Sequence, residues 1–172
     1  LSNFIDTKNK IFYEKSDIDV CNDAFSPPKG YDFSKKIKFL YIVGPHFESI
    51  HKNFFTFVDA LSVFDGLNID YEINVTLTKD QLHNSGIWDY ALDSKTNFLG
   101  YISDQEKMTE LFSDNTILIS TSIIETLGLH VIEGIRSGVI TIAPNESYAR
   151  AVYGDNMILY DTLNSESLLN AI

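Results

Sequence analysis

Two glutamates with a glycine between them form the pattern in this sequence that best suits chemistry. Glu125 lies in a polar turn after the apolar run at 116–120, and Glu133 lies eight positions later in an amphipathic stretch. Gly128 stands where that stretch begins, and a glycine there lets a ligand approach the free N–H groups of a first helical turn, which favour phosphate. Each carboxylate accepts two hydrogen bonds at once and so suits a pair of neighbouring hydroxyl groups. The alternative is that both glutamates are solvated surface residues.

The elements that would hold these residues in place alternate along the chain. From about Lys36 onward, short β-branched runs alternate with longer amphipathic stretches. Strands that are buried on both faces and alternate with helices form a parallel sheet. The sequence therefore predicts an α/β fold, a Rossmann-like parallel sheet flanked by helices, with its ligand at the carboxyl ends of the strands. We expect strands at 38–43, 69–75, 97–99, 116–120, 139–143 and 157–159, and helical segments at 50–64, 104–112, 129–136, 148–153 and 165–172.

The chain divides into two parts. Residues 1–36 have weak periodicity and contain a proline pair, and we interpret them as a linker or entry arm. Residues 37–172 would form one Rossmann-like domain, whose last helix is truncated at Ile172. A chain of 172 residues is long enough for one ordinary domain with a sizeable core.

Composition excludes several classes of function. No apolar run approaches the ~20 residues that would span a bilayer, and residues 1–10 do not resemble a secretory signal. The net charge of −11 argues against nucleic acid or anionic lipid as the main partner, although helix amides and one or two cations can still hold an anionic small ligand. Cys21 is the single cysteine, so neither an internal disulfide nor a structural zinc site is expected. These features favour a cytoplasmic protein.

The stretch from Ser120 to Gly138 resembles the signature of the GT-B glycosyltransferases of the large retaining group called group 1 or family 4. The shared features are the Glu-x7-Glu spacing, a glycine three positions after the first glutamate, and a glycine that stops the helix. The resemblance extends over residues 43–172. It implies that the domain is one half of a GT-B fold, namely the C-terminal half that binds a nucleoside diphosphate sugar, UDP- or GDP-linked, without a metal ion or other cofactor.

The resemblance also implies roles for individual residues. Glu133 would bind the ribose hydroxyls of the donor, and Glu125 would contact the transferred sugar near the anomeric carbon. Lys52 would neutralise the diphosphate leaving group, together with backbone amides of the loop before the helix, and that help matters because the leaving diphosphate gains charge. The catalytic residues would thus be Glu125 and Lys52, and the donor-binding residues would be Glu133, Gly44, Gly128, Leu127, Leu129, Gly100, Tyr101 and Ser122.

Two further sequence features bear on the diphosphate. The family usually has an arginine directly after the first glycine, and this chain has Pro45 there. Either His46 or His51 substitutes for that cation, or the cation is absent. Asp17 and Asp19 spell the Asp-x-Asp that holds a divalent cation in the other glycosyltransferase fold, but this copy precedes the predicted sheet, so no metal site is expected. His130, inside the signature, is interpreted as a packing or surface residue.

The sequence thus predicts the donor domain of a retaining hexosyltransferase. Its acceptor would be a glycan or a lipid-linked molecule in polysaccharide or glycoconjugate biosynthesis, bound by a missing N-terminal domain. The chain alone would be inactive, and the intact protein could associate peripherally with a membrane. Two alternatives remain: a non-catalytic module for sugar-nucleotide binding or partner assembly, and a GT-B epimerase acting on the nucleotide sugar.

Overall fold

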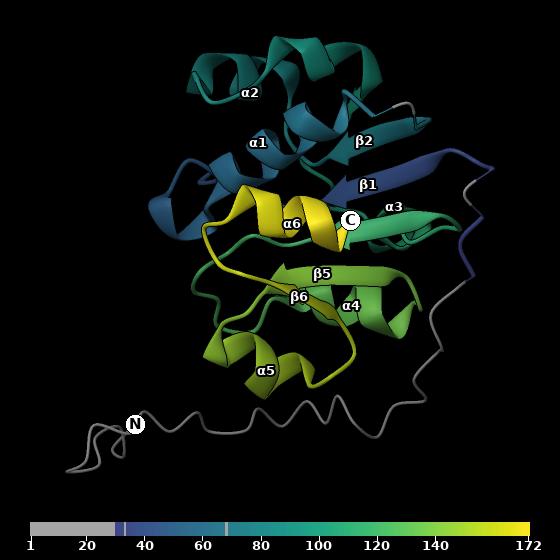
Figure 1. The fold of residues 1–172 in the computed structure, drawn as a ribbon, viewed down its shortest axis with the longest axis vertical. Helices are drawn as coiled ribbons and strands as arrows, with labels where there is room; N and C mark the ends of the chain where they lie inside the picture. Colours follow the sequence, from purple (N-terminus) through teal and green to yellow (C-terminus); the bar gives the residue numbers. More distant parts are fainter. Residues whose placement is uncertain (1–29, 33, 68) are drawn as a thin grey trace.

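The computed structural model describes residues 30–32, 34–67 and 69–172 (Figure 1). Cys21, Asp17, Asp19 and most of the expected entry arm lie outside the described residues. The described residues form a six-stranded sheet in the order β3-β2-β1-β4-β5-β6, and every neighbouring pair is parallel. The predicted Rossmann-like α/β fold is therefore confirmed. The strands are β1 (Ile37–Tyr41), β2 (Tyr71–Val75), β3 (Thr96–Phe98), β4 (Thr116–Ile119), β5 (Ile140–Pro144) and β6 (Ile158–Tyr160).

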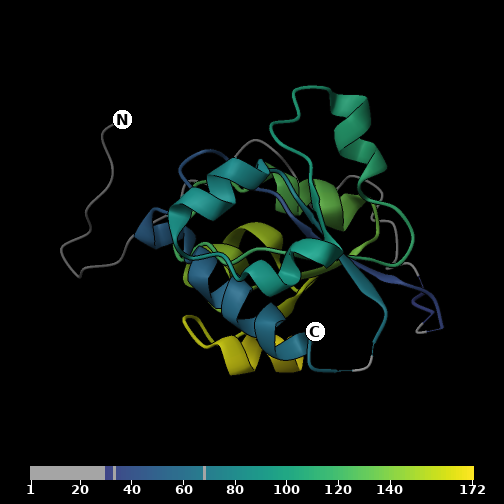
Figure 2. The same ribbon diagram turned by 90° about the horizontal axis from the view of Figure 1, so that it is seen from above.

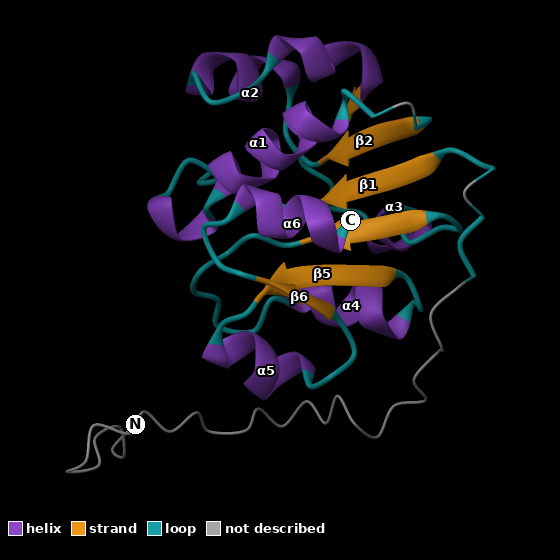
Figure 3. Cartoon of the chain, in the orientation of Figure 1, coloured by secondary structure: helices purple, strands orange, loops and turns teal. Residues whose placement is uncertain are grey.

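Helices cover both faces of the sheet. Figure 2 shows α1 and α6 on one side, with α3 and α4 on the other, and Figure 3 shows how helices and strands alternate along the chain. None of the helices in the described part of the chain is long and apolar enough to cross a membrane. The helices are α1 (Phe54–Phe64), α2 (Lys79–Ser85), α3 (Gln105–Glu110), α4 (Leu129–Arg136), α5 (Ser147–Tyr153) and α6 (Ser165–Ala171), and the short 3-10 helices are η1 (Ile50–Lys52) and η2 (Tyr90–Lys95).

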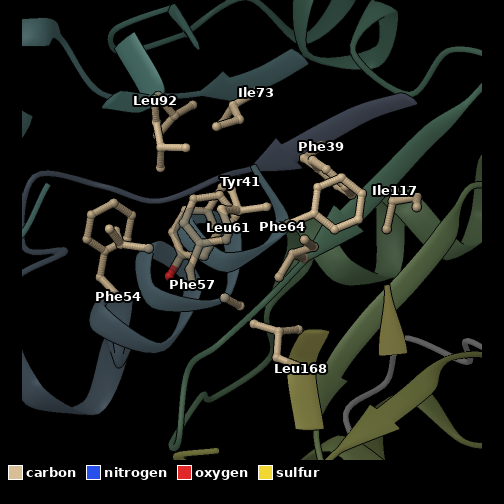
Figure 4. Packing of buried hydrophobic residues seen from close by; sticks show 14 of the residues in the cluster. Phe39, Tyr41, Phe54, Phe57, Leu61, Phe64, Ile73, Leu92, Ile117 and Leu168 are labelled. Atoms are coloured by element: carbon tan, nitrogen blue, oxygen red, sulfur yellow. The ribbon is translucent and has the colours of Figure 1, made fainter. Parts of the chain in front are cut away.

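Aromatic side chains fill the core between the sheet and α1. Phe39 of β1 meets the ring of Phe64 edge-on at a centroid distance of 5.1 Å, and Tyr41 lies 4.3 Å from Phe57 (Figure 4). Such pairs contribute about 0.5–1.5 kcal/mol beyond the area that they bury. Leu168 of α6 joins the same core from the other end of the sequence. The β1 side chains on this face therefore fix where α1 lies.

Helix α4 packs more closely on the opposite face. A Cβ atom on Gly134 would lie 2.5 Å from Cδ2 of Leu118, which is fully buried in β4. Glycine at this position therefore lets α4 approach the sheet closely. This contact sets the direction in which the first turn of α4 points at the carboxyl edge of the sheet.

The predicted helix at 50–64 is interrupted in the structure. It divides into η1 and α1 at Asn53, which takes the left-handed conformation with a φ of 49°. The carbonyl of Lys52 accepts a hydrogen bond from the hydroxyl of Thr121, at 2.8 Å, so that carbonyl serves a contact with a distant loop. The apolar stripe predicted a helix correctly but could not reveal this contact, which forms across the sheet.

Helical segments also occupy residues 79–95, where no element was predicted. Helix α2 is polar and buries only Leu82, so it lacks the apolar stripe on which the prediction depends. Its start carries a capping box in which Thr78 and Gln81 exchange side-chain and backbone hydrogen bonds.

The described end of the expected entry arm packs against the amino ends of the strands. The hydroxyl of Tyr31 donates to the carbonyl of Thr116 in β4 and accepts from the amide of Ile140 in β5, at 2.8 Å. The amide of Asp32 donates to Oδ1 of Asn115 at 3.1 Å, and Nδ2 of Asn115 donates back to the Asp32 carbonyl at 2.9 Å. These residues therefore brace the edge of the sheet that lies opposite the expected ligand.

Replacing Tyr31 by Phe should lower the free energy of unfolding by about 1–3 kcal/mol, because the amide of Ile140 loses its acceptor in a partly buried place. Urea-induced unfolding followed by the fluorescence of Trp88 measures the change. Tyr101→Phe is the matched control, since Tyr101 is 85% exposed and its hydroxyl loss should leave stability unchanged. Equal stability of the Tyr31 variant and the control would show that the 30–36 segment does not brace the sheet.

Candidate functional site

A pocket of about 550 Å³ opens at the carboxyl edge of the sheet, between the ends of β1 and β4. Its volume lies within the range typical of small-molecule sites. Residues from several segments between positions 42 and 130 meet there. The lining residues are Ile42, Val43, Gly44, Lys52, Thr76, Tyr101, Ile102, Met108, Glu125, Thr126, Leu127, Gly128, Leu129 and His130.

The centre of the pocket is an ion pair between Lys52 and Glu125. The lysine Nζ lies 2.8 Å from Oε2 of the glutamate, and the two side chains are only 22% and 18% exposed. Burial alone would raise the pKa of Glu125, but hydrogen bonding and charge attraction from Lys52, with the amide of Thr126 at 3.1 Å, outweigh it and leave that pKa below its ordinary value. The carboxylate therefore stays ionised at neutral pH.

Hydrogen bonds join the segment that carries Lys52 to the loop that carries Glu125. The amide of Ile123 donates to the carbonyl of His51 at 2.7 Å. The Thr121 hydroxyl donates to the carbonyl of Lys52, and it lies 2.6 Å from the hydroxyl of the fully buried Tyr41. The backbone positions of both charged residues are therefore fixed relative to each other by contacts beneath the pocket.

Gly128 is required by both conformation and packing. It is the N-cap of α4 with a φ of 57°, in the left-handed region that favours glycine. A Cβ atom there would lie 2.0 Å from the hydroxyl of Tyr153 in α5. The close approach at this glycine is therefore to a tyrosine of the protein, in addition to any approach by a ligand at the first turn of α4. Tyr148 of α5 supports the same loop, because its hydroxyl donates to the carbonyl of Ser122.

His130 lines the pocket as the second residue of α4. Burial lowers its pKa to about 4, with Lys52 acting in the same direction and Glu125 opposing. The imidazole is therefore neutral at pH 7. The sequence interpretation as an ordinary packing or surface residue did not place it in the pocket, and its position in the signature between the two glutamates was the available signal.

The structure brings together most of the residues expected to form the site. Gly44, Lys52, Tyr101, Glu125, Leu127, Gly128 and Leu129 all line the pocket. Glu133 does not line the pocket; it lies one helical turn after Leu129, where Nε2 of Gln105 donates to its Oε1 at 3.3 Å. Gly100 and Ser122 do not line the pocket. Gly100 makes the turn before Tyr101 with a φ of 67°.

Neither histidine named as a substitute for the missing arginine reaches the pocket. His46 and His51 are exposed, and neither they nor Pro45 lines it. Sequence reasoning also missed lining residues such as Thr76, whose hydroxyl bridges to the end of β1 through the amide and the carbonyl of Val43. Thr76 directly follows β2, so its place at the carboxyl edge could have been inferred from the order of strands. Among the described residues, no group of His, Cys, Asp and Glu side chains could hold a metal ion.

Comparison with known proteins places the chain in one family. Residues 50–172 match the family described as glycosyl transferases group 1, which is well over half of the chain. No curated protein sequence matches it significantly.

Solved structures share the fold. The apo lipopolysaccharide outer core galactosyltransferase WaaB has 17% identity and a TM-score of 0.65, over 84% of this chain and 41% of that protein. Sucrose-phosphate synthase from Thermosynechococcus elongatus has 20% identity and a TM-score of 0.64, over 80% of this chain and 35% of that protein. HepE from Anabaena, in complex with UDP and glucose, has 17% identity and a TM-score of 0.55, over 80% and 38%. The chain therefore spans well under half the length of these relatives, and its sheet is one half of a GT-B fold.

Replacing Gly128 by Ala should destabilise the protein more than the same change at Gly86. Both glycines have positive φ values, 57° and 70°, so each substitution costs about 1–2 kcal/mol in backbone strain. Only Gly128 has an atom in the way, so its variant should lose about 1–3 kcal/mol more through the clash with Tyr153. Urea denaturation of the two variants gives the difference directly. Equal losses of stability in the two variants would mean that the Tyr153 side chain moves aside at no cost in free energy.

The free energy of unfolding should fall as the pH falls from about 6.5 to about 4, because the unfolded His130 takes up a proton in that range while the folded one stays neutral. The lowering of the His130 pKa from 6.5 to about 4 corresponds to a loss of about 3 kcal/mol at most in the free energy of unfolding. Denaturation at several pH values measures it, with His130→Gln as the comparison that removes this contribution and keeps those of the carboxylates. A His130→Gln variant with the same pH dependence as the unmodified protein would contradict a buried neutral His130.

Proposed function

The chain belongs to the glycosyl transferases group 1 family, and we propose that its carboxyl-edge pocket binds the nucleoside diphosphate sugar that donates the transferred sugar. The observation that carries this proposal is the Lys52–Glu125 ion pair, at 2.8 Å, in a pocket beside the first turn of α4. A cation and helix amides suit phosphate groups, whereas a carboxylate suits sugar hydroxyls. A sugar linked to a diphosphate carries both kinds of group next to each other.

In this proposal the lysine and the helix start act on the leaving group. The bond between the anomeric carbon and the phosphate oxygen breaks, and the nucleoside diphosphate leaves with the electron pair. Lys52 and the backbone amides from Leu127 to Leu129 would stabilise that charge, in a pocket of mostly apolar residues that strengthens the interaction. The oxygen of an acceptor hydroxyl then joins the anomeric carbon with retention of its configuration, and the hydroxyl proton passes to the leaving diphosphate.

The other donor-binding residues are assigned roles in order from the centre of the pocket to its mouth. Glu125 would hold hydroxyls of the transferred hexose, and Glu133 would hold ribose hydroxyls, since it continues the face of α4 that Leu129 begins. Tyr101, at the mouth, would lie beside the base, positioned by the turn at Gly100. A Cβ on Gly44 would meet nothing within 4 Å, so the protein itself leaves room beside that glycine for a phosphate. Ser122 would act through the backbone of the loop.

The identity of the donor and the acceptor extends the proposal. The structure of HepE contains UDP and glucose, so UDP is the first nucleotide to test, before GDP. Lys52 would serve in place of a metal ion, and no cofactor is proposed. The acceptor, a glycan or lipid-linked molecule, would bind to a further N-terminal domain of an intact cytoplasmic or membrane-peripheral enzyme. This chain alone would not catalyse transfer.

One observation favours a second candidate. Pro45 occupies the place of the family's arginine, and among the described residues that line the pocket Lys52 is the only permanent cation. Weak donor binding would fit a non-catalytic module that recognises a sugar nucleotide or assembles with a partner. The binding measurement below separates the two.

Calorimetric titration of the chain with UDP, GDP and ADP should show binding of one nucleotide. Glu133→Ala should weaken that binding by about 1–3 kcal/mol, the cost of leaving buried polar groups unpaired. Glu166→Ala, an exposed glutamate in the first turn of α6, is the matched control and should leave the affinity unchanged. The Glu125→Gln variant should weaken binding of the matching nucleotide sugar more than binding of the nucleotide, because Glu125 is assigned to the sugar.

Absence of binding by any nucleotide would favour a non-catalytic module that assembles with a partner. Binding that Glu133→Ala leaves unchanged would keep a nucleotide site but remove the ribose role of Glu133. An unchanged ratio of the two affinities in Glu125→Gln would remove the sugar role of Glu125.

A further inference from the structure

The pocket offers less positive charge than its proposed ligand requires. The diphosphate of a nucleotide sugar carries two negative charges, and Lys52 is the only permanent cation among the described lining residues. That lysine is already paired with Glu125 at 2.8 Å. Pro45, His46 and His51 are exposed, and none of them lines the pocket. Beyond the backbone amides at the start of α4, a second positive charge would therefore have to come from another group.

His130 is the other lining residue that can become a cation by taking up a proton. It interacts electrostatically with both Glu125 and Lys52, so it lies close to the charged pair. In the part of the chain that the structure describes, no residue hydrogen-bonds to its ring. Its two ring nitrogens are therefore available to a ligand that enters the pocket.

We propose, on the basis of the proposed function, that His130 takes up a proton from solvent when the donor diphosphate binds and so supplies the second positive charge. An anion beside an imidazole favours the imidazolium form, because the attraction offsets the cost of burying the charge. The proton adds to the free ring nitrogen, and both nitrogens then donate to acceptors. The residue thus couples donor affinity to pH.

The two charged groups close to His130 act on its protonation in opposite directions. Glu125, from the β4–α4 loop, already favours the imidazolium, and Lys52, from η1, opposes it. When the diphosphate draws Lys52 away from Glu125, the carboxylate becomes available to the imidazolium. Tyr153 of α5 stays neutral because burial raises the pKa of its hydroxyl. Met108 from α3 and Ile102 from the preceding loop contribute no charge to the lining.

The test uses UDP-glucose, GDP-mannose and ADP-glucose, whose phosphates are diesters and do not titrate near neutral pH. The affinity for the sugar nucleotide is measured by calorimetry at about pH 5.5 and about pH 8. It should be about fourfold to thirtyfold higher at the lower pH if ligand binding raises the His130 pKa by about two to three from its value of about 4. Titration near the lower pH in two buffers of different ionisation enthalpy should show net proton uptake. His130→Gln should abolish both the uptake and the pH dependence.

His46→Gln is the matched control, since His46 is exposed outside the pocket, and it should keep the pH dependence. A His130→Gln protein that binds more weakly at both pH values but retains proton uptake would overturn the proposal and leave His130 a structural residue. Equal affinities at both pH values in the unmodified chain would overturn it too, while the donor site itself would stand. Failure of the unmodified chain to bind any of the three sugar nucleotides would instead overturn the proposed function.

Discussion

Lys52 and Glu125 can meet because the chain leaves β1 and its neighbour β4 towards opposite faces of the sheet. β1 leads to α1, which packs on Phe39 and Tyr41, whereas β4 leads to α4, which packs on Leu118. The strand order reverses between these two strands, which leaves a crevice at their carboxyl ends. The hydrogen bonds that join the two exits then fix the separation of the charges. The site depends on this reversal more than on any single side chain.

The ion pair also decides the electrostatics of the pocket. Burial raises the pKa of this carboxylate, and the hydrogen bond and charge of Lys52 help to bring that pKa below its ordinary value. In a protein with a net charge of −11, local positive charge is scarce, so most of what Lys52 can offer an anion is already shared with Glu125. A phosphate group must therefore compete with a carboxylate for the lysine, and the sugar hydroxyls can compensate Glu125 for what it loses. The exchange is then favourable only when one ligand supplies both the phosphate group and the sugar hydroxyls.

Sequence reasoning predicted the sheet, the bounds of α4 and half of the residues that line the pocket, because these depend on local periodicity and on one compact signature. It could not predict the break at Asn53, since the Lys52 carbonyl bonds to Thr121 across the sheet. The role of Gly128 was only half predicted, because the hydroxyl that lies against it belongs to Tyr153, far along the chain. Helix α2 was not predicted because it buries a single side chain and has no apolar stripe. What was missed depends on contacts between distant segments.

The apolar lining ties the charged groups of the pocket to one another. Ile42, Val43 and Leu127 surround the ion pair with groups that neither donate nor accept hydrogen bonds, and Met108 closes one side. Charges interact more strongly in such surroundings than in water. A charge that enters the pocket therefore interacts with Lys52, Glu125 and His130 together. Titration of one of these groups and occupation by an anion are then a single coupled equilibrium. The pocket's charge is therefore a property of the protein with its ligand, and it cannot be read from the arginine position alone.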